Sequence, residues 1–247
     1  DEDTYARKVI ALLDDEELLA VFGSNTRINF SGLDEQTIVD RLLSIYEATR
    51  CEYYSNDIDI VIPDFDDKLV EDLSKKFEIK YFPSYKSIAI KTNDFDYQIN
   101  SFRKDIQSTG RHSKVTSTRS IKEDAERRDF TFNSVYINLL GEVIDFYGGI
   151  DDLHNCYLRF IFDPIDQIQK DYLRAIRYVR FLSLFNQPKT KPHDIDSLIL
   201  LSKNITEFVK TKKISQELNK IYKMPYPENT LNFLKAHKEL NIFLDYL

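Results

Sequence analysis

Several residue types are scarce in this sequence of 247 residues, which has no tryptophan, one methionine, two cysteines and four histidines. Cys51 and Cys156 cannot build a disulfide framework, and the scattered histidines do not show the spacing of a zinc site. We therefore expect a reducing compartment. No apolar run approaches the ~20 residues that a membrane-spanning helix needs, so no membrane association is expected.

What the chain has in quantity are aromatic and charged residues. Hydrophobic residues make up 42%, with 17 Phe and 15 Tyr, which favours an ordered globular protein. The formal net charge is −7, but residues 1–100 hold 22 acidic against 11 basic side chains, and residues 101–247 hold 19 against 23. An acidic part followed by a basic part is compatible with a polyanionic substrate, and equally with ordinary solvated surface charge.

One short stretch, Asn56–Ile62, organises the rest of the interpretation. β-Branched residues alternate here with acids, so the segment reads as a strand with Asp57 and Asp59 on one face and Ile58 and Ile60 on the other. Two neighbouring carboxylates repel each other unless a cation lies between them, and Mg²⁺ is the cation usually bound at such a pair. The alternative is an acidic pair on the exposed face of an edge strand.

Hydrophobic periodicity predicts an α+β domain over residues 20–145 with a mixed, largely antiparallel sheet. The expected helices cover residues 5–21, 37–49 and 67–77, and the expected strands cover residues 57–62, 78–81, 87–92 and 95–100. Between the first two helices, Phe22–Arg27 forms a small polar turn. In it Gly23 and Ser24 could offer N–H groups and a hydroxyl to a phosphate, or could make a plain turn.

A long polar stretch, Arg103–Arg128, follows the last of these strands. It has few apolar residues, which favours a mobile functional loop over a disordered insertion. It leads into Arg127, Arg128 and Asp129. Two adjacent guanidinium groups beside a carboxylate suit triphosphate or sugar oxygens, although an ion-pair cluster would have the same composition.

The motif Arg127-Arg128-Asp129-Phe130-Thr131-Phe132-Asn133 resembles the arginine-rich motif of the class II nucleotidyltransferases, which include tRNA CCA-adding enzymes and bacterial poly(A) polymerases. Further matches follow in the order that the family has. They are the acidic pair Asp57-Ile58-Asp59, the flexible loop with Gly110-Arg111-His112, the turn Asp145-Phe146-Tyr147-Gly148-Gly149, and the neck helix Asp171–Phe181. The resemblance covers about residues 20–245.

The resemblance implies a polymerase-β-like nucleotidyltransferase head domain over residues 1–150 and an all-α neck domain, nucleobase-reading and RNA-binding, over residues 151–247. It implies that Asp57 and Asp59 hold two Mg²⁺ ions for catalysis. Nucleotide-binding roles are implied for Gly23, Ser24, Arg27, Arg111, Arg127, Arg128, Asp129, Asp171, Arg174 and Arg177. Asp171 and Arg174 are three residues apart, so on a helix they would share one face and could pair with a base edge.

The same resemblance implies partners and a location. ATP, CTP and RNA, in particular a tRNA 3′ end, are the expected ligands. A protein partner could replace the helical body and tail domains that follow the neck in the family. The bacterial cytoplasm or the mitochondrial matrix is the expected setting.

Three positions depart from the family pattern. Ile28 stands where the glycine turn usually has an acid, Gln98 replaces a carboxylate on a later strand, with Asp96 two residues away, and Lys170 replaces the acid that begins the neck motif. Three functions therefore stay open. They are an RNA nucleotidyltransferase that adds CCA or A, which we favour, a catalytically degenerate RNA-binding or assembly subunit, and a transferase that acts on a small molecule or a protein hydroxyl.

Overall fold

The computed structural model describes residues 27–29, 57–91, 96–108, 113–138 and 143–247. They form two compact units. The first contains the described residues up to Lys104, with Ser117–Glu126 and Val135–Phe146, and the second contains those of Asp105–Thr116, Arg127–Ser134 and Tyr147–Leu247. The helices expected over residues 5–21 and 37–49 lie outside the described residues.

A mixed sheet of seven described strands forms the first unit, in the order β3-β4-β5-β2-β1-β8-β9. The four central strands β5, β2, β1 and β8 are parallel, and β3, β4 and β9 are joined in antiparallel pairs. The mixed sheet was predicted, but its parallel centre was not, because parallel pairing joins strands that are distant in sequence. The strands are β1 Arg27–Asn29, β2 Asp57–Ile62, β3 Ile79–Phe82, β4 Ser87–Lys91, β5 Asp96–Ser101, β8 Val135–Asn138 and β9 Val143–Asp145.

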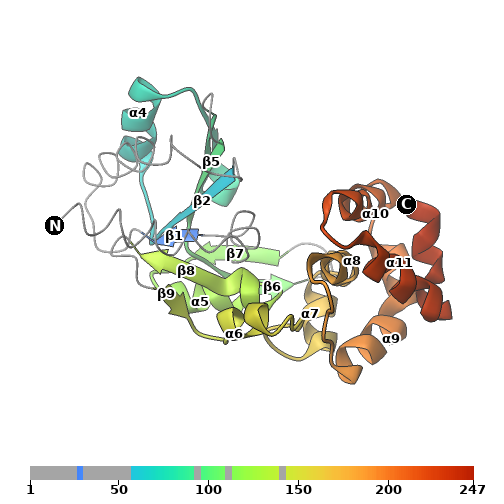
Figure 1. Ribbon diagram of the computed structural model, residues 1–247. Coiled ribbons are helices and arrows are strands. Elements are labelled where there is room, and N and C mark those ends of the chain that lie inside the picture. The colour runs from blue at the N-terminus through green and yellow to red at the C-terminus, as the bar shows by residue number, and fades with distance from the viewer. Residues whose placement is uncertain (1–26, 30–56, 92–95, 109–112, 139–142) are drawn as a thin grey trace. The chain divides into compact units, whose positions relative to one another are not determined.

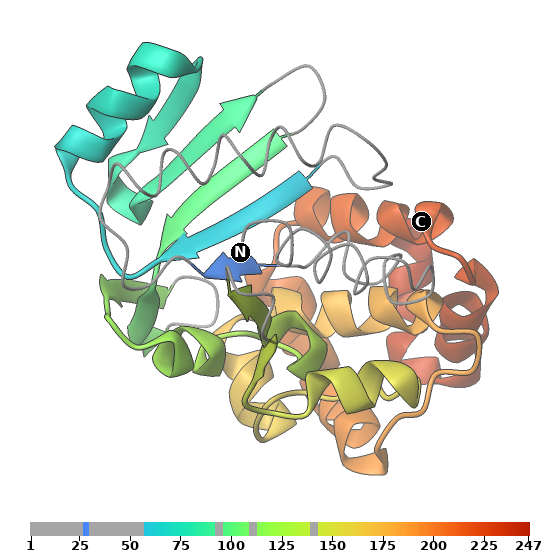
Figure 2. The same cartoon turned by 60° about the vertical axis from the view of Figure 1, so that its left-hand side comes forward.

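Helix α4, Asp67–Lys76, packs on the apolar face of strands β2, β4 and β5 (Figure 2). It begins where the Asp66 carboxylate accepts the N–H groups of Lys68 and Leu69, which would otherwise lack partners at a helix start. Leu69 and Leu73, one turn apart, are fully buried against isoleucines of the strands. Since α4 takes this face, Asp59 of β2 and Asp96 and Gln98 of β5 lie on the other.

The stretch Arg103–Arg128 is more ordered than the sequence analysis predicted. It contains strands β6, Arg103–Ser108, and β7, Ser113–Ser117, which pair in a two-stranded ribbon, and helix α5, Ile121–Glu126. The expectation of a loop was wrong because a two-stranded ribbon needs no continuous apolar face. Ile106, for example, is 62% exposed.

The second unit is largely helical (Figure 1). Its aromatic centre is Phe130, whose ring lies 5.0 Å from that of Phe160 and 5.4 Å from that of Phe181. Helix α8 packs against α7, α10 and α11. The helices are α6 Gly149–His154, α7 Pro164–Lys170, α8 Leu173–Phe181, α9 Pro192–Phe208, α10 Thr211–Leu218 and α11 Pro227–Ala236, with the 3-10 turns Leu182–Leu184 and Asn219–Lys223 between α8 and α9 and between α10 and α11.

Two details of the helical unit bear on the sequence analysis. Asp163 accepts the N–H groups of Ile165 and Asp166 and so starts α7, with Pro164 at its first position. Among the helices that the structure describes, none combines the length and apolar content that crossing a bilayer requires.

Candidate functional site

The polar face of the first unit centres on β2. Asp59 is half-buried and pairs in register with Gln98 of β5, while the backbone of Asp57 is in register with Asp96. Asp96 and Gln98 are exposed, whereas the residues that alternate with them on β5 are buried. Parallel neighbours in register point to the same side of a sheet, so Asp59 shares its face with Asp96 and Gln98. The predicted strand at 57–62 is confirmed.

The carboxylate and amide oxygens on this face are suitable ligands for a hard divalent cation. Carboxylate and amide oxygens are the ligands that Mg²⁺ prefers, and it commonly takes only one or two carboxylates, with water and substrate phosphates completing its shell. Asp59 and Asp96 supply such oxygens from adjacent strands. Within the described ranges, no group of three or more His, Cys, Asp or Glu side chains is assembled for a metal. The residues fit a cation held jointly with a ligand.

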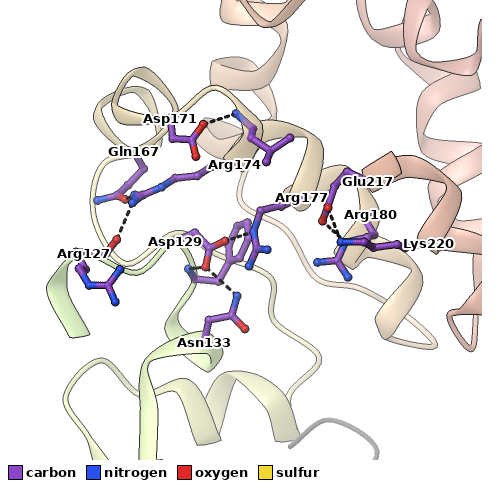
Figure 3. Close-up of polar contacts among 12 residues, drawn as sticks. Arg127, Asp129, Asn133, Gln167, Asp171, Arg174, Arg177, Arg180, Glu217 and Lys220 are labelled. Atoms are coloured by element: carbon purple, nitrogen blue, oxygen red, sulfur yellow. Dashed lines mark hydrogen bonds and ion pairs between the residues drawn. The ribbon is translucent and has the colours of Figure 1, made fainter. Parts of the chain in front are cut away.

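A second polar centre lies in the helical unit around Asp129, which is only 7% exposed (Figure 3). Its Oδ1 accepts hydrogen bonds from the Phe130 backbone N–H at 3.0 Å and from Asn133 Nδ2 at 2.8 Å. Its Oδ2 accepts one from Arg177 Nε at 2.5 Å. The carboxylate therefore holds Arg177 in place. Arg127 and Arg128, just before it, are half-exposed.

Electrostatics explain why Asp129 stays ionised although it is buried. Burial alone raises the pKa of a carboxyl, but the guanidinium groups of Arg177 and Arg174, with the hydrogen bonds from Asn133 and Arg177, outweigh it. The pKa of Asp129 is consequently well below its usual value. The same pairing opposes the effect of burial on Arg177, whose pKa is raised. Both groups are charged over the whole physiological range.

Helix α8 presents three arginines, each with described partners. Arg174 is 9% exposed and donates through Nη1 to Gln167 Oε1 and through Nη2 to the Arg127 carbonyl oxygen at 2.6 Å. Arg180 forms an ion pair at 2.7 Å with Glu217 of α10. Arg174, Arg177 and Arg180 follow one another at intervals of three residues, which places them on neighbouring parts of one helix face. The face is thus a row of fixed cations.

The position of Asp171 differs from the sequence-based prediction. The neck helix was expected to begin at Asp171, but α8 begins at Leu173 and Asp171 is extended, with φ −152°. Its carboxylate accepts the Leu173 N–H at 3.0 Å, and the Arg174 N–H bonds to its carbonyl. Helical spacing therefore does not place Asp171 and Arg174 on one face, although the hydrogen bond between their backbones closes one turn of the chain.

Other predicted site residues are described incompletely or not at all. Gly23, Ser24 and Arg111 lie outside the described residues, and Arg27 starts β1 with its side chain outside them. Two residues that sequence reasoning missed are Asn133 and Gln167, which hold Asp129 and Arg174. The spacing of four between Asp129 and Asn133 was a signal, whereas nothing local pointed to Gln167.

Comparison with known proteins gives a consistent result. The poly(A) polymerase head domain family model matches residues 40–159. The human mitochondrial CCA tRNA nucleotidyltransferase 1 is 34% identical over 139 residues, which cover 55% of this chain and 31% of that protein. The CCA-adding enzyme of Enterococcus faecalis is 31% identical over 130 residues, which cover 52% and 32%. The chain thus matches about a third of the length of these relatives.

Solved structures show the same fold. The CCA-adding enzyme of Bacillus stearothermophilus in complex with CTP aligns with a TM-score of 0.63 at 23% identity, covering 83% of this chain and 47% of that one. A CCA-adding enzyme in its apo form II aligns with a TM-score of 0.66 at 17% identity, covering 94% and 55%.

A mixed sheet with an acidic central strand, followed in the chain by a helical unit with a row of arginines, is the fold that this chain shares with the solved CCA-adding enzymes. The match over residues 40–159 and these relatives make the chain similar to the class II nucleotidyltransferases, the family of the CCA-adding enzymes and poly(A) polymerases.

Proposed function

We propose that the protein is a template-independent RNA nucleotidyltransferase that adds CCA, or A alone, to the 3′ ends of tRNA, using CTP and ATP. The observation that carries this proposal is the network around Asp129, in which the buried Arg174 and the half-buried Arg177 of α8 are held at fixed positions by acceptors of the protein. A preorganised pair of guanidinium groups suits a nucleoside triphosphate, which is a polyanion with hydrogen-bonding base edges.

In this proposal Arg174 and Arg177 of α8 bind different parts of the nucleotide. Arg174, with the carboxylate of Asp171 one turn before it, pairs with the edge of the incoming base. Arg177, oriented by Asp129, faces the phosphates. Arg127 and Arg128 are half-exposed and would bind phosphate and ribose oxygens, together with Gly23, Ser24, Arg27 and Arg111.

Asp57 and Asp59 would hold Mg²⁺ on the polar face of β2, with Asp96 as a further oxygen donor. Bound there, the metal would favour ionisation of the attacking 3′-hydroxyl and neutralise the charge on the leaving pyrophosphate. The strand supports this role because it fixes the backbone of both aspartates. The head and neck domains proposed to carry these steps are residues 1–150 and 151–247.

Partners and location are part of the same proposal. A tRNA or another RNA 3′ end is the proposed acceptor, and a protein partner could supply the surfaces that the body and tail domains provide in the family. The relatives include a mitochondrial and a bacterial enzyme, which supports the mitochondrial matrix or the bacterial cytoplasm.

The test is incorporation of labelled nucleotides into tRNA that lacks its 3′ end. We expect the purified protein with Mg²⁺ to incorporate C and then A, and the substitution Asp59→Asn to lower kcat by on the order of 1000-fold, since losing a metal-binding carboxylate removes several kcal/mol from transition-state stabilisation. Asp72→Asn is the matched control, because Asp72 lies on α4 in an exposed pair with Lys75 and its loss should leave activity unchanged.

The products distinguish the remaining functions. Incorporation of A alone would indicate tailing of RNA in place of CCA addition. A folded protein that binds tRNA but incorporates no nucleotide would contradict the proposal and favour the assembly subunit, for which the amide of Gln98 on the polar face of β5 is the observation in support.

A further inference from the structure

A substitution in the neck motif leaves a question about Arg174. The family motif begins with an acid followed by Asp, whereas this chain has Lys170 followed by Asp171. A lysine cannot accept a hydrogen bond from a guanidinium group. The ammonium group of Lys170 lies 5.9 Å from the centre of the Phe162 ring. Some other residue must therefore orient Arg174.

Gln167 lies on α7, one turn before Lys170, and supplies a hydrogen-bond acceptor for Arg174 (Figure 3). Its side chain is fully buried, and its Oε1 accepts from Arg174 Nη1. Arg174 Nη2 donates to the Arg127 carbonyl at 2.6 Å. The two terminal nitrogens of one planar group are thus held by two separate segments, which fixes both its position and its plane.

Electrostatics favour a neutral acceptor at this point. Burial lowers the pKa of Arg174, and the charges of Asp129 and Asp171 oppose that effect. Because these carboxylates already stabilise the charge of Arg174, the remaining requirement is a hydrogen-bond acceptor of fixed position. Gln167 meets it with its oxygen alone, since its Nε2 has no hydrogen-bond partner in the described part of the structure.

We propose that Gln167 is a positioning residue that fixes the guanidinium plane of Arg174 and thereby sets the choice between CTP and ATP, in place of the acid that is absent at position 170. This inference rests on the proposed function. Arg174 has further N–H donors besides the two that Gln167 and Arg127 engage, and their direction follows from the plane. Tilting the plane would therefore change the direction in which those N–H donors meet the base edge.

The experiment compares Gln167→Leu, which removes the acceptor at similar volume, with Gln167→Glu, which keeps it. The readout is the ratio of kcat/KM for CTP to that for ATP on tRNA lacking its 3′ end. We expect Gln167→Leu to change the ratio by roughly 10-fold or more, as one misdirected hydrogen bond to a charged group would. We expect Gln167→Glu to keep the ratio within about 3-fold of the original, because its carboxylate accepts from Arg174 in the same place.

Lys170→Met serves as the control on the same helix, and it should leave the ratio unchanged because Lys170 lies at Phe162. Thermal unfolding of each variant is measured in parallel. A purely structural role for Gln167 predicts that Gln167→Leu lowers the unfolding midpoint and both kcat/KM values with their ratio unchanged, and that result would overturn the inference.

The proposed function can fail separately. If the unaltered protein incorporates no nucleotide, the activity is refuted, and calorimetric binding of CTP and ATP replaces the kinetic readout. A change in relative affinity in Gln167→Leu alone then supports the positioning role, whereas an unchanged relative affinity, or a protein that binds neither nucleotide, refutes it.

Discussion

At the scale of single residues, burial has opposite outcomes for two carboxyl groups of the helical unit. Asp129 is ionised because Arg177, Arg174 and Asn133 surround it, and its pKa is low. Asp194, in the first turn of α9, is 3% exposed and has a pKa raised to about 6. Burial is the largest cause there, and the opposing charges of Lys191 and His193 do not compensate for it.

The raised pKa of Asp194 predicts how stability depends on pH. Folding favours the protonated carboxyl, so the cost of ionising it is absent below about pH 4, the unfolded value, and complete above the folded value of about 6. We expect this group to make the protein less stable at pH 7 than at pH 5 by about 1 kcal/mol. Urea unfolding at the two pH values measures the difference.

Asp194→Asn provides the comparison, because an amide does not titrate. The pH 5 to pH 7 difference should shrink by that amount in the variant, while nearby titratable groups such as His193, which pairs with Asp163, are retained in both proteins. An equal pH dependence in the two proteins would show that Asp194 is not the source.

At the scale of elements, a buried ion pair joins two helices of the second unit. Arg180 of α8 and Glu217 of α10 have side chains 10% and 8% exposed, with Nε and Oε1 2.7 Å apart. The Arg180 guanidinium also lies 3.9 Å from the centre of the Phe181 ring. Burial raises the pKa of Glu217, but the charge of Arg180 and the hydrogen bond from Lys220 outweigh it, so the pKa is lowered.

We expect Glu217→Gln to lower the free energy of unfolding by about 3 kcal/mol, because it leaves the charge of Arg180 buried without a counter-charge. Lys220, the other partner of Glu217, is 53% exposed. Lys220→Ala should therefore cost less than about 1 kcal/mol. Chemical denaturation of both variants measures these values, and similar losses in the two would argue that solvent screens the Arg180 pair.

Elements also show where prediction succeeded. Strand β2, helix α4 and strands β3 to β5 were predicted close to their observed bounds, because each buries one face with a regular period. The ribbon of β6 and β7 was missed, because a strand pair without a buried face leaves no such period. The start of the neck helix was predicted two residues too early, because Asp171 has an extended backbone and accepts the Leu173 N–H from outside the helix.

At the scale of the whole molecule, the charge distribution bears on RNA binding. The net charge is −7, yet residues 101–247 carry four more basic than acidic side chains. If RNA phosphates are bound by lysines and arginines of this part, binding releases counterions and weakens with salt.

We expect the affinity for tRNA lacking its 3′ end to fall roughly 10-fold or more between 50 and 200 mM KCl. Fluorescence anisotropy of labelled tRNA measures it. Sucrose at matched osmolality is the control, since it changes water activity without screening charge. An affinity that does not respond to KCl would contradict binding through phosphates.

The sequence by itself determined the local elements, the acidic strand and the motif that holds Arg127, Arg128 and Asp129, because these depend on residue type and on spacing along a few turns or pleats. Only the tertiary structure decided that the central strands are parallel, that Asp129 holds Arg177 across 48 residues, and that Gln167 and the Arg127 carbonyl hold Arg174. The physical reason is that these contacts join separate elements, most of them distant in the chain and, for Gln167 and Arg174, the successive helices α7 and α8. Packing of buried side chains, and not local periodicity, selects the partner of each polar group there.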